Sequence, residues 1–247
     1  MDIQYTSDHL FHFVGHAVPG DHQKNFDTLK KVLSAGCVSH PPHENNHGTV
    51  GYKIDWDCSL STEELIIPYV TCFADIPEKS LGIHIKKYGS FGVSFWKETL
   101  IMAGARPVMY IPMHPLDGLS ATGGKIILKD LEAIYKGFNQ QVSSKRDNSK
   151  AEWVKRGRSL GKEPENEDAA INAMENAFSK YFLAFIKPFD SQLGNDHQDN
   201  YYMEREWRKY GNLKFKSEDV CKIFVAHGFK DQMAKDFPVY AGKIEET

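Results

Sequence analysis

Hydrophobic positions recur along this chain in two rhythms, and each rhythm predicts one kind of element. Short runs of aromatic and β-branched residues predict strands, at residues 10–15, 65–73, 92–95 and 107–111. Spacings of three and four residues between apolar side chains predict helices, at residues 21–36, 76–88 and 169–186. Residues 217–224 read as a helix or a strand. Because the strands are short and do not alternate regularly with helices, we predict an α+β fold rather than a doubly wound sheet.

The length of 247 residues suits one large domain, so we expect a single domain over residues 1–247. Its texture changes after about residue 139, where residues 140–168 become rich in Lys, Arg, Glu, Ser and Asn. We therefore predict a charged insertion at about residues 140–200, partly mobile in its first half. The tail after Pro238 is expected to fray.

Charge and composition narrow the class of protein. The 30 Lys and Arg residues against 33 Asp and Glu residues give a net charge of -3, so no global basic field attracts nucleic acid. The four cysteines are scattered and predict reduced core thiols, Cys72 in a buried strand among them. No signal-peptide pattern or apolar run long enough for a membrane is apparent. We expect a cytoplasmic protein with no membrane contact.

Histidines invite a metal hypothesis, since His40, His43 and His47 lie within eight residues of one another. They stand among Pro, Asn and Gly residues, however, and no His-Glu-x-x-His helix or Cys pair accompanies them. We expect solvated loop histidines and no metal. A metal-dependent hydrolase is the weaker alternative.

The strongest chemical candidate is a pair of carboxylates, Glu204 and Glu206. Two residues apart in an extended strand, they would project from one face. Such a pair can bind a ribose hydroxyl or stabilise an oxocarbenium-like cation. The structural alternative is an ion pair between a Glu and an Arg beneath a core Trp. Spacing alone leaves both interpretations open.

The order of the segments points to a family. Residues 10–13, the helix ending in Val-Leu-Ser-Ala-Gly, residues 72–77, residues 84–95 and residues 204–208 follow one another in an order that resembles the AbiGi-like abortive-infection proteins, bacterial phage-defence proteins described mostly as antitoxins. The resemblance covers most of the chain outside residues 140–200. These proteins look distantly similar to ADP-ribosyltransferase-fold toxins, which implies a split β-sheet core flanked by helices.

The resemblance implies catalytic roles for the two carboxylates. Glu206 would hold the ribose 2′-hydroxyl of NAD and stabilise the cation as nicotinamide leaves. Glu204 would select or deprotonate the acceptor. The two roles are exchangeable between these residues.

The resemblance also implies four cofactor-binding residues. His12 would bond a ribose, Tyr88 would stack on the nicotinamide ring, and Ser94 and Thr71 would touch the cofactor. Each has a structural alternative: His12 satisfied by backbone, Tyr88 packing a helix end onto the sheet, and the two hydroxyls bonded to backbone.

The implied function is an NAD-dependent ADP-ribosyltransferase toxin or effector of anti-phage defence, paired with a cognate antitoxin and needing no metal. Its acceptor would be an RNA or a protein, reached through the basic insertion from Lys145 to Arg158, which otherwise reads as a solvated helix and loop. The alternative function is a catalytically inactive antitoxin-like protein that neutralises a partner toxin by surface contact.

Overall fold

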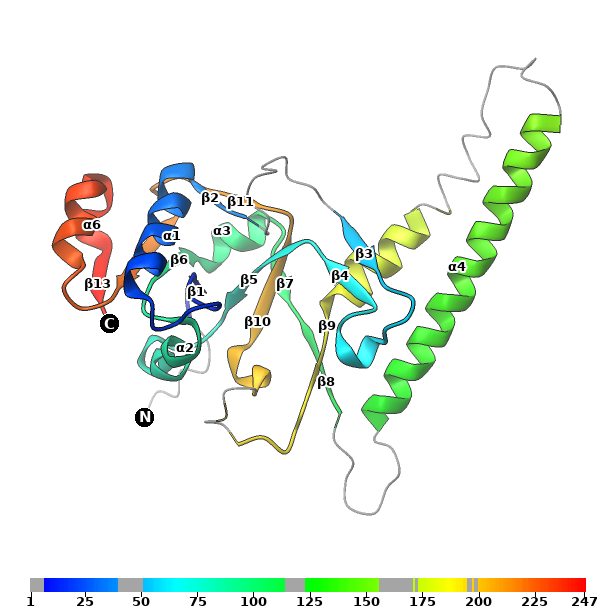
Figure 1. The fold of residues 1–247 in the computed structure, drawn as a ribbon, viewed down its shortest axis with the longest axis horizontal. Coiled ribbons are helices and arrows are strands. Elements are labelled where there is room, and N and C mark those ends of the chain that lie inside the picture. The colour runs from blue at the N-terminus through cyan, green and yellow to red at the C-terminus, as the bar shows by residue number, and fades with distance from the viewer. Residues whose placement is uncertain are drawn as a thin grey trace. The chain divides into compact units, whose positions relative to one another are not determined.

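The computed structural model describes residues 7–39, 51–113, 123–155, 171, 173–194, 197 and 200–247. The chain forms two compact units (Figure 1). Unit 1 comprises residues 1–51, 69–108 and 192–247, and unit 2 comprises residues 52–68 and 109–191. Unit 2 thus begins well before the expected insertion at residue 140. The single domain that we expected stays a prediction.

Unit 1 is built on a mixed seven-stranded sheet. Its strands, in spatial order, are β13 (Ile244–Glu246), β12 (Val220–Val225), β6 (Gly92–Trp96), β1 (His9–Phe13), β5 (Val70–Ala74), β10 (Glu206–Tyr210) and β7 (Arg106–Pro107). All neighbours pair antiparallel except β12 and β13, which are parallel. A separate antiparallel pair joins β2 (Cys37–Val38) to β11 (Leu213–Lys214).

Short helices surround this sheet in unit 1. They are α1 (His22–Ala35), η2 (Glu78–Ser80), α2 (Leu81–Tyr88), α3 (Lys97–Met102), η5 (Tyr201–Glu204), α6 (Lys230–Asp236) and η6 (Pro238–Lys243). The predicted first helix is confirmed as α1. The side chain of Asp21 accepts the backbone N–H of Lys24 at 3.0 Å, and Gly36 ends the helix at a φ of 55°.

The sheet of unit 1 is covered on both faces. On one face, here called the α1 face, Leu10 and Val93 pack with Leu29 of α1. On the other, the α2 face, Phe11 and Phe13 pack with Leu81 of α2. Successive strand residues point to opposite faces, so the apolar run of β1 supplies both cores.

Unit 2 contains two small strand pairs and helices. Its elements are β3 (Tyr52–Ile54), η1 (Leu60–Thr62), β4 (Ile66–Pro68), β8 (Met109–Pro112), α4 (Gly123–Lys155), η3 (Ala177–Phe182), η4 (Leu183–Phe185) and β9 (Ile186–Phe189). β3 and β4 pair antiparallel, and β8 and β9 pair parallel. The core of unit 2 includes Leu65, Ile111, Leu128 and Tyr135.

The structure confirms the coarse prediction, an α+β fold with a mixed sheet and several helices. The strands at residues 10–15 and 92–95 and the helix ending at Tyr88 are present, and residues 217–224 hold strand β12. Two predicted strands are each divided, because residues 65–73 supply β4 to unit 2 and β5 to unit 1. Residues 107–111 are divided in the same way, between β7 and β8.

The helix predicted at residues 169–186 is confirmed in the described part of the chain, where residues 171 and 173–176 are α-helical and the helix continues through η3 and η4 as far as Phe185. Residues 140–155 of the predicted insertion continue α4, on one side of which Leu128, Tyr135 and Val142 lie buried at seven-residue spacing. The mobility that we expected there stays a prediction. One prediction about the chain ends was wrong. The tail, expected to fray, forms η6 and β13 because Ile244 is buried in the core.

The structure also bears on two further predictions, the burial of the cysteines and the absence of a membrane span. Cys37 is buried as expected, but Cys72 is exposed, since its register opposite Arg208 places it on the α2 face away from the apolar cluster. No helix in the described part of the chain is long and apolar enough to cross a membrane.

The C-terminal strand β13 should contribute measurably to the stability of the fold. Replacing Ile244 with Ala should lower the free energy of unfolding by about 2–5 kcal/mol, because it removes a side chain that is only 3% exposed. Val239→Ala, at a side chain that is 63% exposed, is the control and should cost less than about 0.5 kcal/mol. Chemical denaturation measures both. If both substitutions had equally small effects, the result would instead support the prediction that the tail is frayed.

Candidate functional site

The two predicted catalytic carboxylates lie on different backbone elements. Glu204 ends η5, and β10 begins at Glu206. Arg205 between them adopts a left-handed conformation with a φ of 45°. The backbone N–H of Asp75 fixes this turn by donating to the carbonyl oxygens of Glu204 at 3.1 Å and Arg205 at 3.3 Å. The expectation of one strand carrying both carboxylates was therefore wrong, since a left-handed turn at Arg205 separates η5 from β10.

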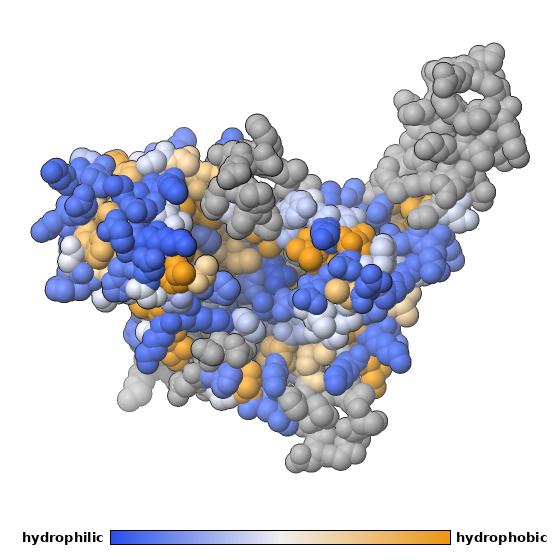
Figure 2. Space-filling view, viewed as in Figure 1, coloured by the Kyte–Doolittle hydropathy of each residue, from blue (hydrophilic) through white to orange (hydrophobic). Residues whose placement is uncertain are grey.

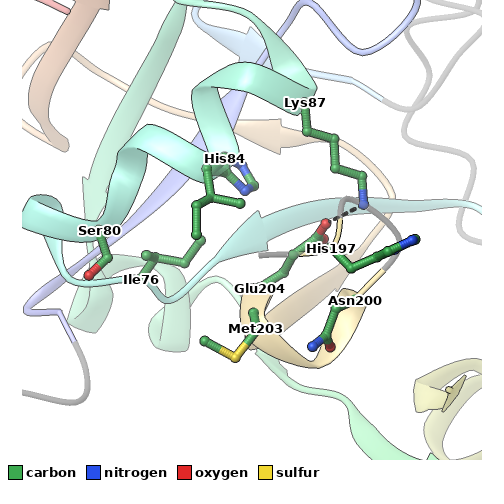
Figure 3. Close-up of a pocket in the computed structure, with 9 residues that line it drawn as sticks. Ile76, Ser80, His84, Lys87, His197, Asn200, Met203 and Glu204 are labelled. Carbon is green, nitrogen blue, oxygen red and sulfur yellow. Dashed lines mark hydrogen bonds and ion pairs between the residues drawn. The ribbon is translucent and has the colours of Figure 1, made fainter. Parts of the chain in front are cut away.

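Glu204 holds two side chains of α2. Its Oε1 accepts from Lys87 Nζ at 2.7 Å (Figure 3). The same oxygen accepts from the hydroxyl of Tyr88 at 2.8 Å. The side chains of Lys87 and Glu204 are each only 14% exposed. Lys87 Nζ also lies 3.8 Å from the ring centroid of Tyr201. The ion pair thus fastens η5 to α2.

The Tyr88 hydroxyl remains a hydrogen-bond donor. Burial, followed by the charge of Glu204, raises the pKa of Tyr88 well above its ordinary value. Its ring packs at 4.4 Å from the ring of His84 and at 5.4 Å from that of His16. The expected alternative for Tyr88, packing the end of a helix onto the sheet, is present.

His84 is buried between aromatic rings and stays neutral. It is 8% exposed, and its ring lies 5.2 Å from that of Phe13 on the sheet. Burial, helped by the charge of Lys87, lowers the pKa of His84 to about 3. At neutral pH its ring is therefore an uncharged donor and acceptor.

Glu206 forms a buried ion pair of its own. Arg208 Nε donates to Glu206 Oε1 at 2.7 Å, and the two side chains are 8% and 7% exposed. Both lie on the α2 face, where Glu206 is paired with Ala74, while Trp207 packs into the core of the opposite face. The Glu–Arg pair beside a core Trp, our structural alternative, is therefore present. The catalytic role of Glu206 stays a prediction.

The two predicted hydroxyl residues bond to backbone. Ser94 is fully buried, and its Oγ accepts the backbone N–H of Lys222 at 3.1 Å. The hydroxyl of Thr71 donates to the carbonyl oxygen of Gly211 at 3.3 Å. These contacts match the structural alternative for each residue and do not test a role with NAD.

His12 lies apart from the carboxylates. Its Nδ1 is 2.9 Å from the carbonyl oxygen of Cys72, and its register opposite Val93 places it on the α1 face. Alternation along β5 places Thr71 on the α1 face as well. Of the six predicted site residues, the structure joins Tyr88 and Glu204, and it separates His12 and Thr71 from Glu206 by the thickness of the sheet.

The prediction from sequence did not single out Lys87, His84 or Asn200. Lys87 carried a usable signal, since it precedes Tyr88 on a helix. Asn200 carried none, because it lies in a polar loop. Its Nδ2 donates to the carbonyl oxygens of Leu193 at 3.1 Å and Gly194 at 3.0 Å. These contacts hold the loop that leads into η5.

Two other predicted features fall partly or wholly outside the described residues. His40, His43 and His47 lie outside them, and no group of three metal-ligating side chains occurs in the part that is described. The insertion from Lys145 to Arg158 runs along α4 as far as Lys155 and then leaves the described residues. Binding of an RNA or protein acceptor there stays untested.

Glu204, Lys87 and Tyr88, here called the Glu204 cluster, should contribute to stability. Lys87→Met should lower the free energy of unfolding by about 2–3 kcal/mol, because it leaves a largely buried carboxylate, 14% exposed, without its cation. Tyr88→Phe should cost about 1.5–3 kcal/mol, the value of one hydrogen bond to a charged group. Urea denaturation measures both, with the exposed Lys86→Met on the same helix as control. Adding Glu204→Gln to Lys87→Met should recover part of the loss; no recovery would contradict this account.

Buried His84 should make stability depend on pH. Its pKa rises from about 3 in the folded chain to 6.5 in the unfolded chain. Between these values the unfolded chain alone binds the proton, so stability falls on acidification by up to about 1.4 kcal/mol per pH unit. His84→Leu should flatten the curve of unfolding free energy between pH 6.5 and pH 4.5. Ile101→Ala, which removes no titratable group at a side chain that is 50% exposed, should leave the slope unchanged; identical slopes for all three proteins would refute the argument.

Two comparisons of this chain with known proteins found no match. No curated protein shows a significant match to this chain, and no solved structure does either. The similarity to ADP-ribosyltransferases is therefore not shown, and neither is use of NAD.

The family is shown by a different comparison. Residues 52–242, well over half of the chain, match the family model described as "Putative abortive phage resistance protein AbiGi, antitoxin". This description overturns our main functional prediction, an ADP-ribosyltransferase toxin, and favours the alternative, an antitoxin. The matched region includes η5, β10 and the three residues of the Glu204 cluster. The chain belongs to the AbiGi family of abortive phage resistance proteins.

Proposed function

We propose that this protein is an antitoxin that binds a cognate toxin protein and blocks its activity in an abortive-infection pair. The observation that carries the proposal is the family match over residues 52–242, whose description names an antitoxin. Because the match includes residues of both units, it supports this function for the chain as a whole rather than for one unit.

The arrangement of the charged residues supports a binding role. Glu204 is occupied by Lys87 and Tyr88, and Glu206 is occupied by Arg208. Glu204 therefore holds η5 against α2, and Glu206 is neutralised within β10. A rigid framework of this kind suits recognition, since a preorganised surface loses less entropy on binding.

The surface also offers apolar contacts to a protein partner. Figure 2 shows small groups of hydrophobic residues within a mostly hydrophilic surface on the face that it displays. Exposed large hydrophobic side chains in unit 1 include Ile83, Trp96, Ile101 and Met203. Scattered exposed side chains are ordinary, so position and surroundings must decide which of them a partner contacts.

Growth of a bacterial host tests the proposal. Each protein encoded by a gene adjacent to that of this chain would be tested as the candidate toxin, expressed alone, with this chain, and with an unrelated protein at the same level. We expect growth arrest with the toxin alone and with the unrelated protein, and restored growth with this chain. Affinity purification of the tagged chain should recover the toxin as a complex.

Two results would contradict the antitoxin function. The first is growth arrest when this chain is expressed alone, which is the behaviour of a toxin. The second is unrelieved arrest by the toxin when circular dichroism shows that this chain is folded and abundant.

A further inference from the structure

Trp56 presents one face of its indole ring at the surface of unit 2. The residue lies in the turn between β3 and η1 and is 45% exposed. The other face of the indole stacks on the ring of Tyr135 in α4, with the ring centroids 5.6 Å apart and the planes at 25°. The lysines that lie over aromatic rings elsewhere in the described chain do not lie over Trp56. A flat aromatic face is therefore open to a partner.

The core of unit 2 holds this indole in place. Tyr135, on which it stacks, is fully buried, and the Tyr135 ring also stacks on that of Phe178 at 5.7 Å. The turn is fixed as well, because the backbone N–H of Asp57 donates to Asp55 Oδ1 at 3.2 Å. A ring that is already held in one position loses little entropy when a partner binds.

The turn that carries Trp56 is negatively charged. Residues 55–64, here called the acidic segment, contain the carboxylates of Asp55, Asp57, Glu63 and Glu64 and no Lys or Arg. Glu63 is paired with Lys187, whose Nζ lies 3.5 Å from Glu63 Oε2. The other three carboxylates form no ion pair with any of the described residues. Their charges are therefore available to a cation from outside the chain.

The three unpaired carboxylates lie close together in space. Partial burial of Cys58, followed by the negative charges of Asp55, Glu64 and Asp57, raises the pKa of its thiol. These carboxylates are not placed to bind a metal ion, since no group of three such ligands occurs in the part of the chain that the structure describes. They instead give the turn a negative field that attracts an organic cation.

This charge decides which occupant suits the open indole face. A nucleobase could stack on the indole, but the carboxylates would repel the phosphates attached to it. A neutral apolar side chain would take water from the carboxylates without supplying a cation. A flat cation gains from both features, because it can stack on the indole and donate hydrogen bonds to carboxylates. Arginine has such a side chain, whereas the ammonium group of lysine is compact and not planar.

We propose that Trp56 and the acidic segment bind an arginine side chain of the partner toxin. The guanidinium would lie flat on the open face of the indole, and its N–H groups would donate to the exposed carboxylates of Asp57 and Glu64. Tryptophan and arginine are both enriched at the energetic centres of protein interfaces. This inference rests on the proposed antitoxin function.

Short peptides test the surface without the toxin. The full chain would be titrated at low salt with tetra-arginine, tetra-lysine and tetra-citrulline, the last of which keeps the shape of arginine without its charge. NMR of the indole N–H of Trp56 would follow binding. We expect tetra-arginine to bind most tightly, tetra-lysine to bind about two- to fivefold more weakly, and tetra-citrulline not to bind measurably.

Three results of these titrations would overturn the proposal. The first is binding of tetra-lysine or tetra-citrulline as tight as that of tetra-arginine. The second is the absence of any response of Trp56 to tetra-arginine at low salt, where attraction between exposed charges is strongest. The third is a response of Trp56 to an oligouridylate but not to tetra-arginine, which would indicate that the surface binds RNA.

Matched tryptophan variants locate the contact. Trp56→Leu keeps an apolar cover on Tyr135 but removes the flat face. Trp96→Leu makes the same change in unit 1, at an indole that is 47% exposed against 45% for Trp56. Calorimetry should show that tetra-arginine binds Trp56→Leu about two- to fivefold more weakly and binds Trp96→Leu as it binds the original chain. Circular dichroism checks folding, and unchanged binding by folded Trp56→Leu would count against this site.

A charge variant keeps the test decisive if Trp56→Leu fails to fold. Asp57→Asn combined with Glu64→Gln retains Trp56 and removes two exposed charges. Its control, Asp231→Asn combined with Glu218→Gln, removes two exposed charges from unit 1. Tetra-arginine should bind the first double variant about two- to fivefold more weakly and the control as it binds the original chain. Equal losses would show attraction by net charge alone and would overturn the proposed contact.

The tryptophan variants also separate this contact from the antitoxin function. The toxin should bind Trp56→Leu at least about fivefold more weakly than it binds Trp96→Leu, as expected for a residue at the centre of an interface. Equal affinity of the toxin for both variants would overturn the contact while leaving the antitoxin function intact. Failure of the original chain to restore growth would instead contradict the antitoxin function, whatever the result of the peptide titrations.

Discussion

The buried carboxylate of Asp75 is the constraint on which unit 1 most depends. Its Oδ1 accepts the backbone N–H of Ser7 at 2.9 Å, and its Oδ2 accepts Lys97 Nζ at 2.9 Å. The backbone N–H of the same residue holds the turn at Glu204 and Arg205. One residue at the end of β5 therefore connects the segment before β1, the start of α3 and the turn before β10. Because an unpaired buried charge costs several kcal/mol, these segments are fixed together.

Because Asp75 holds the turn at Arg205, Glu204 and Glu206 have different partners. Glu204 faces α2 and closes a pocket with Lys87, while Glu206 stays within the sheet beside Arg208. A pair that looks symmetrical along the chain becomes asymmetrical in space. This pocket in unit 1 is lined by Met203 and Glu204 of η5 and by Ile83, His84 and Lys87 of α2.

Much of unit 1 could be predicted from sequence because local signals were strong. Aromatic residues in β1 and β6, and the Asp21 cap and Gly36 stop of α1, all agree with the final fold. The turn at Arg205 could not be predicted, since an arginine with positive φ leaves no compositional signal of the kind that glycine leaves. The division of residues 65–73 into β4 and β5, and of residues 107–111 into β7 and β8, could not be predicted either. It depends on the strands with which each half pairs, and those strands are distant in sequence. Asn200 was missed for the same reason, because its importance comes from Leu193 and Gly194.

The two edges of the seven-stranded sheet limit how another protein can approach it. β7 is two residues long and contains Pro107, which has no N–H to offer, and β13 is three residues long and carries Glu245 and Glu246. Short, charged or proline-containing edges discourage the pairing of further strands. Extension of the sheet by an incoming strand, the mode called β-augmentation, is accordingly disfavoured along the edges of the described sheet. A partner protein that binds at these two edges would contact side chains rather than unpaired backbone groups, and side chains can change during evolution while the backbone stays the same.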